Sequence, residues 1–299
     1  MDRQQQPSGI HHLAFTPDGK ILASVGGMTD LEGEVRLWDT ATGRARATLP
    51  GHAGAVYAVV FSPDGTVLAT AGEDGTLRMW EVDSGCLRLM LPGHGERVSW
   101  LAFSADGTTL ASAGPDWRVR LWDPATGRER AALRGFGPIT FSPDGRYLAF
   151  LVEDARWICL WDVAAGQEST RLHEPGGCIS SVAYSPDGQS LAVAHEEQAV
   201  SLWSLVTRKV RRTVHVPGGA VNAVTFSPDG RELALVVQDG TVQLWNAATG
   251  EQTAHLAGHR GAVETVAFAP DGRSLASGSY DTTVRLWRSA TVGDHIEAE

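Results

Sequence analysis

The sequence is poor in cysteine and in long apolar segments. Its 299 residues include 3 cysteines, and Cys86, Cys159 and Cys178 lack the spacing of metal ligands. This argues against a disulfide framework and against a zinc site. No apolar stretch approaches ~18 residues, and the N-terminal residues lack the apolar core of a signal peptide. We therefore expect a protein of the reducing cytoplasm that does not enter a membrane.

Positive charge is also scarce. The chain has 25 lysines and arginines against 35 acidic residues, for a net charge of −10. Neither a nucleic-acid backbone nor an anionic membrane is an expected partner for such a surface. Lysine is almost absent, since only Lys20 and Lys209 accompany the arginines, and alanine and glycine are abundant. This bias hints at a GC-rich, bacterial genome.

Tryptophan, in contrast, is abundant and regularly spaced. Seven of the 10 tryptophans recur every 42 residues, with a single interval of 39, at Trp38, Trp80, Trp122, Trp161, Trp203, Trp245 and Trp287. A period of this length is typical of repeat architectures, in which each unit buries its apolar surface against its neighbours. Seven units use almost the whole chain, so we predict one closed domain over residues 1–299, with repeats from about residue 10 to 288.

Each unit carries the turn signals of a four-stranded sheet. About 20 residues before each repeat tryptophan lies a tetrapeptide such as Ser62-Pro63-Asp64-Gly65, whose proline, aspartate and glycine suit a tight hairpin. Asp74-Gly75 and Ser84-Gly85 mark two further turns in the same unit. Four short strands account for the period, and radial stacking would bury both faces of each sheet. We predict an all-β fold: a seven-bladed β-propeller with a four-stranded antiparallel sheet in each blade.

These marks also carry a family resemblance. Gly51-His52, Asp74 in its turn, and Trp80-Glu81 or Trp122-Asp123 resemble the signature of the WD-repeat (WD40) β-propellers. The resemblance covers residues 10 to about 288 and repeats seven times. It implies a non-catalytic, monomeric platform without cofactors, which binds other proteins or peptides on the upper face of the ring.

In three units, a histidine, a hydroxyl residue, an aspartate and the repeat tryptophan recur at fixed spacing. The three sets are His52, Thr70, Asp74 and Trp80; His94, Ser112, Asp116 and Trp122; and His259, Ser277, Asp281 and Trp287. Each contains the residue types of a hydrolase triad. The resemblance instead implies structural hydrogen-bond relays, and the repetition agrees, because a catalytic constellation is normally built once. We therefore assign no catalytic residue and no metal ligand.

Three consecutive units lack this set. The units of Trp161, Trp203 and Trp245 place Phe150, Val193 and Leu235 at the position of the hydroxyl residue. We predict that apolar packing replaces the polar relay in these blades.

The other tryptophans point to a binding site. Trp100, Trp117 and Trp157 fall in the third and fourth units, and Arg97, Arg118 and Arg156 accompany them. Tryptophan and arginine are enriched at binding hot spots, so we predict a patch that recognises acidic and apolar side chains of a partner protein. The alternative is that these tryptophans fill the gap left by the shortened loop at residues 135–138. Filling is the favoured interpretation for Trp100, and both interpretations stay open for Trp117 and Trp157.

Two other functions and one structural question also stay open. The chain could be a propeller enzyme, or a sensor of a small ligand or sugar in the central channel, for which Trp100 and His12 are the only hints. The outer strand of the last blade could come from the residues before Ile10 or from residues 294–299, and the latter are favoured.

Overall fold

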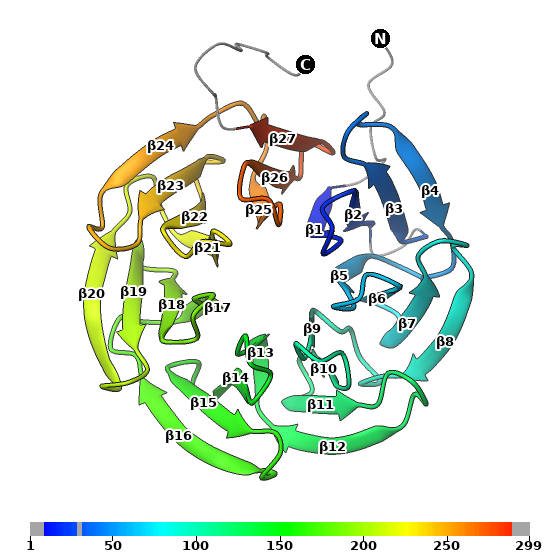
Figure 1. Ribbon diagram of the computed structural model, residues 1–299, viewed down its shortest axis with the longest axis horizontal. Helices are drawn as coiled ribbons and strands as arrows, with labels where there is room; N and C mark the ends of the chain where they lie inside the picture. Colours follow the sequence, from blue (N-terminus) through cyan, green and yellow to red (C-terminus); the bar gives the residue numbers. More distant parts are fainter. Residues whose placement is uncertain (1–8, 29–31, 289–299) are drawn as a thin grey trace.

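The computed structural model describes residues 9–28 and 32–288, which form a ring of seven β-sheets (Figure 1). Blades 1 to 3 contain the following strands: β1 (Ile10–Phe15), β2 (Ile21–Gly26), β3 (Glu34–Asp39), β4 (Ala45–Leu49), β5 (Val56–Phe61), β6 (Val67–Gly72), β7 (Thr76–Glu81), β8 (Leu87–Pro92), β9 (Trp100–Phe103), β10 (Leu110–Ala113), β11 (Arg118–Trp122) and β12 (Glu129–Arg134).

Blades 4 to 7 repeat the pattern with the remaining strands: β13 (Phe136–Phe141), β14 (Tyr147–Val152), β15 (Trp157–Asp162), β16 (Gln167–His173), β17 (Ile179–Tyr184), β18 (Ser190–His195), β19 (Ala199–Ser204), β20 (Lys209–His215), β21 (Val221–Phe226), β22 (Glu232–Val237), β23 (Val242–Asn246), β24 (Gln252–Leu256), β25 (Val263–Phe268), β26 (Ser274–Ser279) and β27 (Val284–Arg288). Over the described residues no helix is long and apolar enough to cross a membrane.

Every blade is an antiparallel meander whose first strand lies at the axis (Figure 1). Successive strands run in opposite directions, so the first-to-second and third-to-fourth turns share the lower face of the ring. The second-to-third turns and the loops between blades share the upper face. The predicted seven-bladed β-propeller is therefore confirmed.

The core of the protein lies between the blades rather than within them. The second strands β2 and β6 are buried at every residue, whereas the outer strands β4 and β8 are mostly exposed. Each of the seven apolar clusters draws residues from two neighbouring blades. A single four-stranded sheet could not bury both of its apolar faces, which explains why the units stack into a ring.

The same packing closes the ring. Ile10, Leu13 and Leu22 of blade 1 form one cluster with Ala276 of blade 7. Blade 7 has three strands within the described residues, β25, β26 and β27. The outer strand predicted for residues 294–299 lies outside the described part of the chain.

Candidate functional site

Blades 2, 3 and 7 each contain a complete chain of hydrogen bonds. In blade 2, Trp80 Nε1 donates to Thr70 Oγ1 at 2.9 Å, and Thr70 Oγ1 lies 2.8 Å from His52 Nε2. On its other side, His52 Nδ1 lies 3.1 Å from the carboxylate of Asp74. Blades 3 and 7 repeat this geometry at 2.7–3.0 Å with His94, Ser112, Asp116 and Trp122 and with His259, Ser277, Asp281 and Trp287. Each chain ties a connecting loop and a turn to two strands.

Electrostatics set the direction of these bonds. Burial lowers the pKa of His94 and His259, although Asp116 and Asp281 act in the opposite sense, so both imidazoles are neutral at pH 7. Burial opposes ionisation of Asp281, but hydrogen bonds from Thr283 and the Arg260 N–H outweigh it and lower its pKa to about 2. A neutral imidazole that donates from Nδ1 to a carboxylate must accept at Nε2. The hydroxyl therefore donates to the histidine and accepts from the tryptophan.

The relays are closed to substrate. Thr70, Ser112 and Ser277 each have 0% of their surface exposed. Their hydroxyl groups have the partners of a catalytic serine but not its access to a ligand. A fully satisfied buried network of this kind holds one specific arrangement of loops and strands.

Blade 5 contradicts the prediction of apolar replacement. Trp203 Nε1 donates to Glu174 Oε2 at 2.6 Å, and Ser201 Oγ donates to Glu174 Oε1 at 3.2 Å. His195 Nε2 lies 3.0 Å from the same Ser201 hydroxyl. Glu174 and His195 are buried, at 1% and 0% exposure. Val193 does occupy the usual hydroxyl position, but the polar chain is rebuilt from other residues.

Blade 6 departs from the prediction in a simpler way. Trp245 Nε1 donates to Gln243 Oε1 at 3.1 Å, and Gln243 Nε2 donates to the carbonyl oxygen of Pro217 at 2.8 Å. Only blade 4 follows the prediction, with a buried Phe150 packed beneath its connecting loop. The missed residues left a signal: Ser201 and Gln243 lie two positions before the repeat tryptophan, where four of the other blades have arginine. Residues two apart in a strand point to the same face, so each of these side chains lies on the same face as the tryptophan of its own blade.

The structure distributes the six patch residues over separate contacts on the upper face of blades 3 and 4. Trp117 lies in the turn between β10 and β11 and packs edge-on against Phe136, with ring centroids 4.6 Å apart. It remains 54% exposed. Its backbone has φ 58°, in the left-handed region, and its carbonyl oxygen accepts a hydrogen bond from the Gly135 N–H. Sequence reasoning had not assigned Phe136 to the patch.

The other two tryptophans are more enclosed. Trp100 is half-buried against Gly137, where any side chain would collide with its ring. Trp157 is half-buried and packs against His173, with ring centroids 4.5 Å apart. Both also contact the apolar cluster between blades 3 and 4. Trp100 thus has the surroundings of a packing residue.

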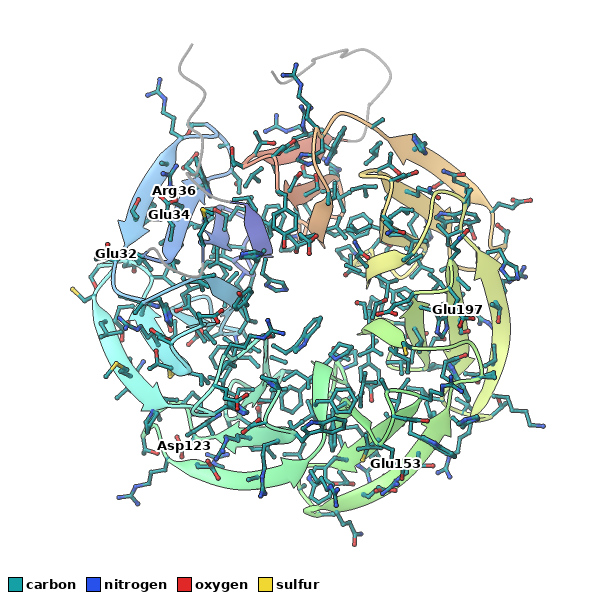
Figure 2. The ribbon with its side chains drawn as sticks, turned by 180° about the vertical axis from the view of Figure 1, so that it is seen from behind. Glu32, Glu34, Arg36, Asp123, Glu153 and Glu197 are labelled. Atoms are coloured by element: carbon teal, nitrogen blue, oxygen red, sulfur yellow. The ribbon has the colours of Figure 1, made fainter. Side chains whose placement is uncertain are left out.

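The three arginines differ in their surroundings but share exposure to solvent. The Arg97 guanidinium lies 5.7 Å from the Tyr57 ring centroid, towards blade 2. Arg118 lies opposite another arginine, Arg134, in the register of β11 and β12. Arg97, Arg118 and Arg156 form no ion pair with any residue that the structure describes. By contrast, Glu153, labelled in Figure 2, pairs with Arg171 at 2.6 Å. The patch therefore carries positive charge that the described residues leave without an ion pair.

His12 and Trp100, the two residues that suggested a ligand in the central channel, both make contacts within the protein. His12 Nδ1 lies 3.0 Å from the carbonyl oxygen of Val59 on the neighbouring strand β5. Trp100 packs on Gly137, as described above. Residues 9–28 and 32–288 contain no group of three or more histidine, cysteine, aspartate or glutamate side chains that could hold a metal ion.

Comparison with known proteins agrees with this architecture. The family model described as "IFT122 first beta-propeller" matches residues 9–217, and the one described as "WD domain, G-beta repeat" matches residues 208–246 and 250–288. Together they span every blade of the ring.

Relatives are similar over short segments. The chain is 42% identical over 66 residues to WD repeat-containing protein 90 of Mus musculus, which is 21% of this chain and 4% of that protein. It is 44% identical over 62 residues to pre-mRNA-processing factor 19 homolog 2 of Arabidopsis thaliana, 21% of this chain and 11% of that protein. It is 39% identical over 75 residues to target of rapamycin complex subunit wat1 of Schizosaccharomyces pombe, 24% of this chain and 22% of that protein.

The matches thus cover less than a quarter of each relative, and all three relatives are eukaryotic, so they add nothing to the predicted bacterial source. The larger family match, the closed ring of seven blades and the repeated hydrogen-bond relays lead to one conclusion: this chain belongs to the WD-repeat β-propeller family.

Proposed function

We propose that this protein is a non-enzymatic scaffold that binds a partner protein or peptide on the upper face of blades 3 and 4. The observation that carries this proposal is the exposure of Trp117, a large aromatic side chain that is 54% exposed in a turn with positive φ. Blades 2 and 6 place Gly75 and Gly240 at the same position of the turn, and blades 5 and 7 place Gln198 and Thr282 there.

A tryptophan at this position is costly to the fold. The left-handed region disfavours a residue with a Cβ by about 1–2 kcal/mol, and glycine avoids this strain. Burial offsets only part of this strain, since Trp117 stays 54% exposed while its ring contacts that of Phe136. Strained residues cluster at functional sites, where the surrounding structure holds them in place. Gln198 and Thr282 adopt the same backbone conformation in blades 5 and 7, so the reason to expect a ligand is the large exposed ring of Trp117 and not the backbone alone.

The surrounding charge indicates the kind of partner. Arg118 is next to Trp117 in the chain, and Arg156 lies in the corresponding turn region of blade 4. Asp116, the adjacent acid, is already engaged by His94 at 2.7 Å and by Arg120 at 3.3 Å. A partner segment that combines an aromatic or aliphatic side chain with carboxylates would contact the Trp117 ring and the arginines together.

The family supports this assignment, because WD-repeat propellers generally bind other proteins. Their rigid ring presents loops in fixed positions, and binding residues are commonly found on such loops. In this chain the relays supply that rigidity, whereas the patch lies where blades 3 and 4 depart from the repeat.

Selection from a peptide library displayed on phage tests the proposal. Peptides retained by the wild-type protein should be enriched in acidic and aromatic residues. They should lose at least about tenfold in affinity for a Trp117→Gly, Arg118→Ala variant, the loss expected when a hot-spot pair is removed. The glycine substitution suits the turn, so this variant should fold as well as the wild type.

Thr282→Gly is the matched control. Thr282 has φ 71° at the equivalent turn position of blade 7, so the substitution makes the same backbone change away from the patch. Peptide affinity should not change. Equal affinity of all three proteins for the selected peptides would show that partners bind elsewhere.

A further inference from the structure

The first strands surround the axis of the ring (Figure 1), and one position near their upper ends differs from blade to blade. It lies four residues before the aromatic residue that ends the strand, and in six blades it falls at a register shift of the type made by β-bulges. The seven blades place there His11, Tyr57, Ser99, Gly137, Ser180, Asn222 and Glu264. Blade 7 is thus the only one with a carboxylate at this position.

Aromatic rings from blades 7, 1 and 2 form a row on the same side of the axis. The His11 ring centroid lies 5.7 Å from that of Tyr280, in an edge-on contact, and 4.9 Å from that of Tyr57. Tyr280 belongs to the second-to-third turn of blade 7 and is 52% exposed. No other blade has an aromatic residue at this turn position, where blades 2 and 6 have Glu73 and Gln238. An exposed tyrosine is therefore particular to blade 7, as is the carboxylate.

The Glu264 side chain is half-buried, but its carboxylate oxygens are accessible to solvent. It forms no hydrogen bond or ion pair with any residue that the structure describes. Burial raises the pKa of Glu264, and burial together with the nearby Glu264 charge raises the pKa of Tyr280. Burial also lowers the pKa of His11, so the imidazole is neutral at pH 7 and does not balance the carboxylate. A positive charge from a ligand would stabilise this partly desolvated anion.

The opposite end of the aromatic row has the opposite charge. The Arg97 guanidinium lies 5.7 Å from the Tyr57 ring centroid, within the range of a cation–π contact. Arg97 is one of the patch residues of blades 3 and 4, which favour carboxylates. The Glu264 end lies on the other side of His11, in blade 7, so the upper face presents two sites of opposite preference.

A cationic side chain matches both groups at the Glu264 end. An ammonium or guanidinium group is attracted to the face of a tyrosine ring and donates charge-assisted hydrogen bonds to a carboxylate. An anion would be repelled, and an apolar side chain would remove Glu264 from water without giving it a partner. We propose that Glu264, Tyr280 and His11 bind a lysine or arginine side chain of a partner peptide. This site does not depend on the patch around Trp117.

The test uses the Trp117→Gly, Arg118→Ala variant, which lacks the first patch, so that failure of one site can be distinguished from failure of the other. Random peptides displayed on phage are selected on this variant, and the retained peptides should be enriched in lysine and arginine. The affinity of one such peptide is measured by titration calorimetry. A copy with acetyl-lysine or citrulline in place of its basic residues should bind about tenfold more weakly, the loss expected for one charge-assisted hydrogen bond.

Adding Glu264→Gln to this variant removes the charge and keeps the shape of the side chain, and it should weaken binding by the same factor. The six other blades have no carboxylate at this position, so the fold should tolerate the change, which urea denaturation checks. Adding Tyr280→Gln introduces the residue of blade 6 and should weaken binding about two- to fivefold through loss of the cation–π contact.

Glu196→Gln is the matched control, because it removes an exposed carboxylate from the equivalent turn of blade 5, on the same face of the ring. It should leave the affinity unchanged. Selection that retains no basic peptides would overturn the proposal, as would equal binding of the neutral copy. Equal effects of Glu264→Gln and Glu196→Gln would also overturn it, since binding would then not depend on Glu264 in particular.

Discussion

The indole of Trp203 donates a 2.6 Å hydrogen bond to the carboxylate of Glu174, which is only 1% exposed. In blades 2, 3 and 7, the same indole position donates to a hydroxyl group on the second strand. Blade 5 has Val193 at the position of that hydroxyl group. Its indole N–H donates instead to Glu174, a residue of the connecting loop. Six of the seven repeat tryptophans thus donate to a side-chain acceptor, because an indole N–H without one is costly, and among the described residues the exception is Trp161 of blade 4.

Replacing Glu174 by alanine should destabilise the protein severely. The change removes the acceptor of Trp203 and of Ser201 and leaves both donors buried. Each buried donor left without a partner costs about 1–3 kcal/mol, so the two together cost roughly 2–6 kcal/mol. The free energy of unfolding, measured by urea denaturation at pH 7, should fall by that amount.

Glu174→Gln is the matched variant, because it keeps the shape and one acceptor oxygen for Trp203. Its loss should be much smaller than that of Glu174→Ala. Similar losses for the two variants would mean that Glu174 contributes by packing and not as an acceptor.

The relay of blade 2 allows a similar comparison, between a variant of Thr70 that lacks the hydroxyl group and one that keeps it. Thr70→Val keeps the volume of a side chain that is 0% exposed but removes the hydroxyl bonded to Trp80 and His52. Two buried groups then lack partners, so we expect a loss of roughly 2–4 kcal/mol in unfolding free energy. Thr70→Ser keeps the hydroxyl used in blades 3 and 7 and should lose about 1 kcal/mol for the missing methyl group. A valine variant as stable as the serine variant would contradict a role for the hydrogen bonds.

Local periodicity was enough to predict the ring. The interval between tryptophans fixes the number of units, and the turn signals around residues such as Asp64 and Asp74 fix four strands per unit. The relay partners His52, Thr70 and Asp74 could also be identified, because the same spacing recurs in three blades.

What could not be predicted depends on how side chains from non-repeating loops reach across the fold. Glu174 is 29 residues before Trp203, where blades 2, 3 and 7 have the glycine that precedes the relay histidine, so the repeat pattern predicts no side-chain acceptor at this position. The packing of Trp117 on Phe136 likewise depends on the shortened loop before β13, whose path only the three-dimensional structure reveals. The sequence thus predicts the contacts between residues that repeat. It does not predict contacts that a single blade makes with residues outside the repeat pattern.

Stability should decrease as the pH falls from 7 to 5. Burial lowers the pKa of His94, His195 and His259 in the folded state. Below the unfolded value of about 6.5, the unfolded chain therefore binds protons that the folded chain does not, which favours unfolding. Each histidine can contribute at most about 1.4 kcal/mol per pH unit. Asp281, with a pKa of about 2, adds a second loss of stability below roughly pH 4, as the pH falls towards its folded pKa.

Urea denaturation at pH 5, 6 and 7 measures this linkage directly. The slope of unfolding free energy against pH should be positive, and it should be smaller in a His94→Asn variant, which lacks one of the three groups. A stability that stays level or increases towards pH 5 would show that the folded histidines accept protons as readily as the unfolded ones.

The three cysteines should differ in reactivity according to their burial. Cys86 and Cys178 are exposed, whereas Cys159 is buried on β15 and faces Phe150 in the register of the sheet. Burial raises the pKa of the Cys159 thiol to about 12, so it holds almost no thiolate at pH 8. Labelling of the native protein with iodoacetamide, followed by mass spectrometry, should modify Cys86 and Cys178 quickly and Cys159 only when blade 4 opens. A Cys86→Ser, Cys178→Ser variant should therefore react in urea but not in buffer. Rapid native labelling of that variant would place the third thiol at an accessible surface and contradict the packing of blade 4 described above.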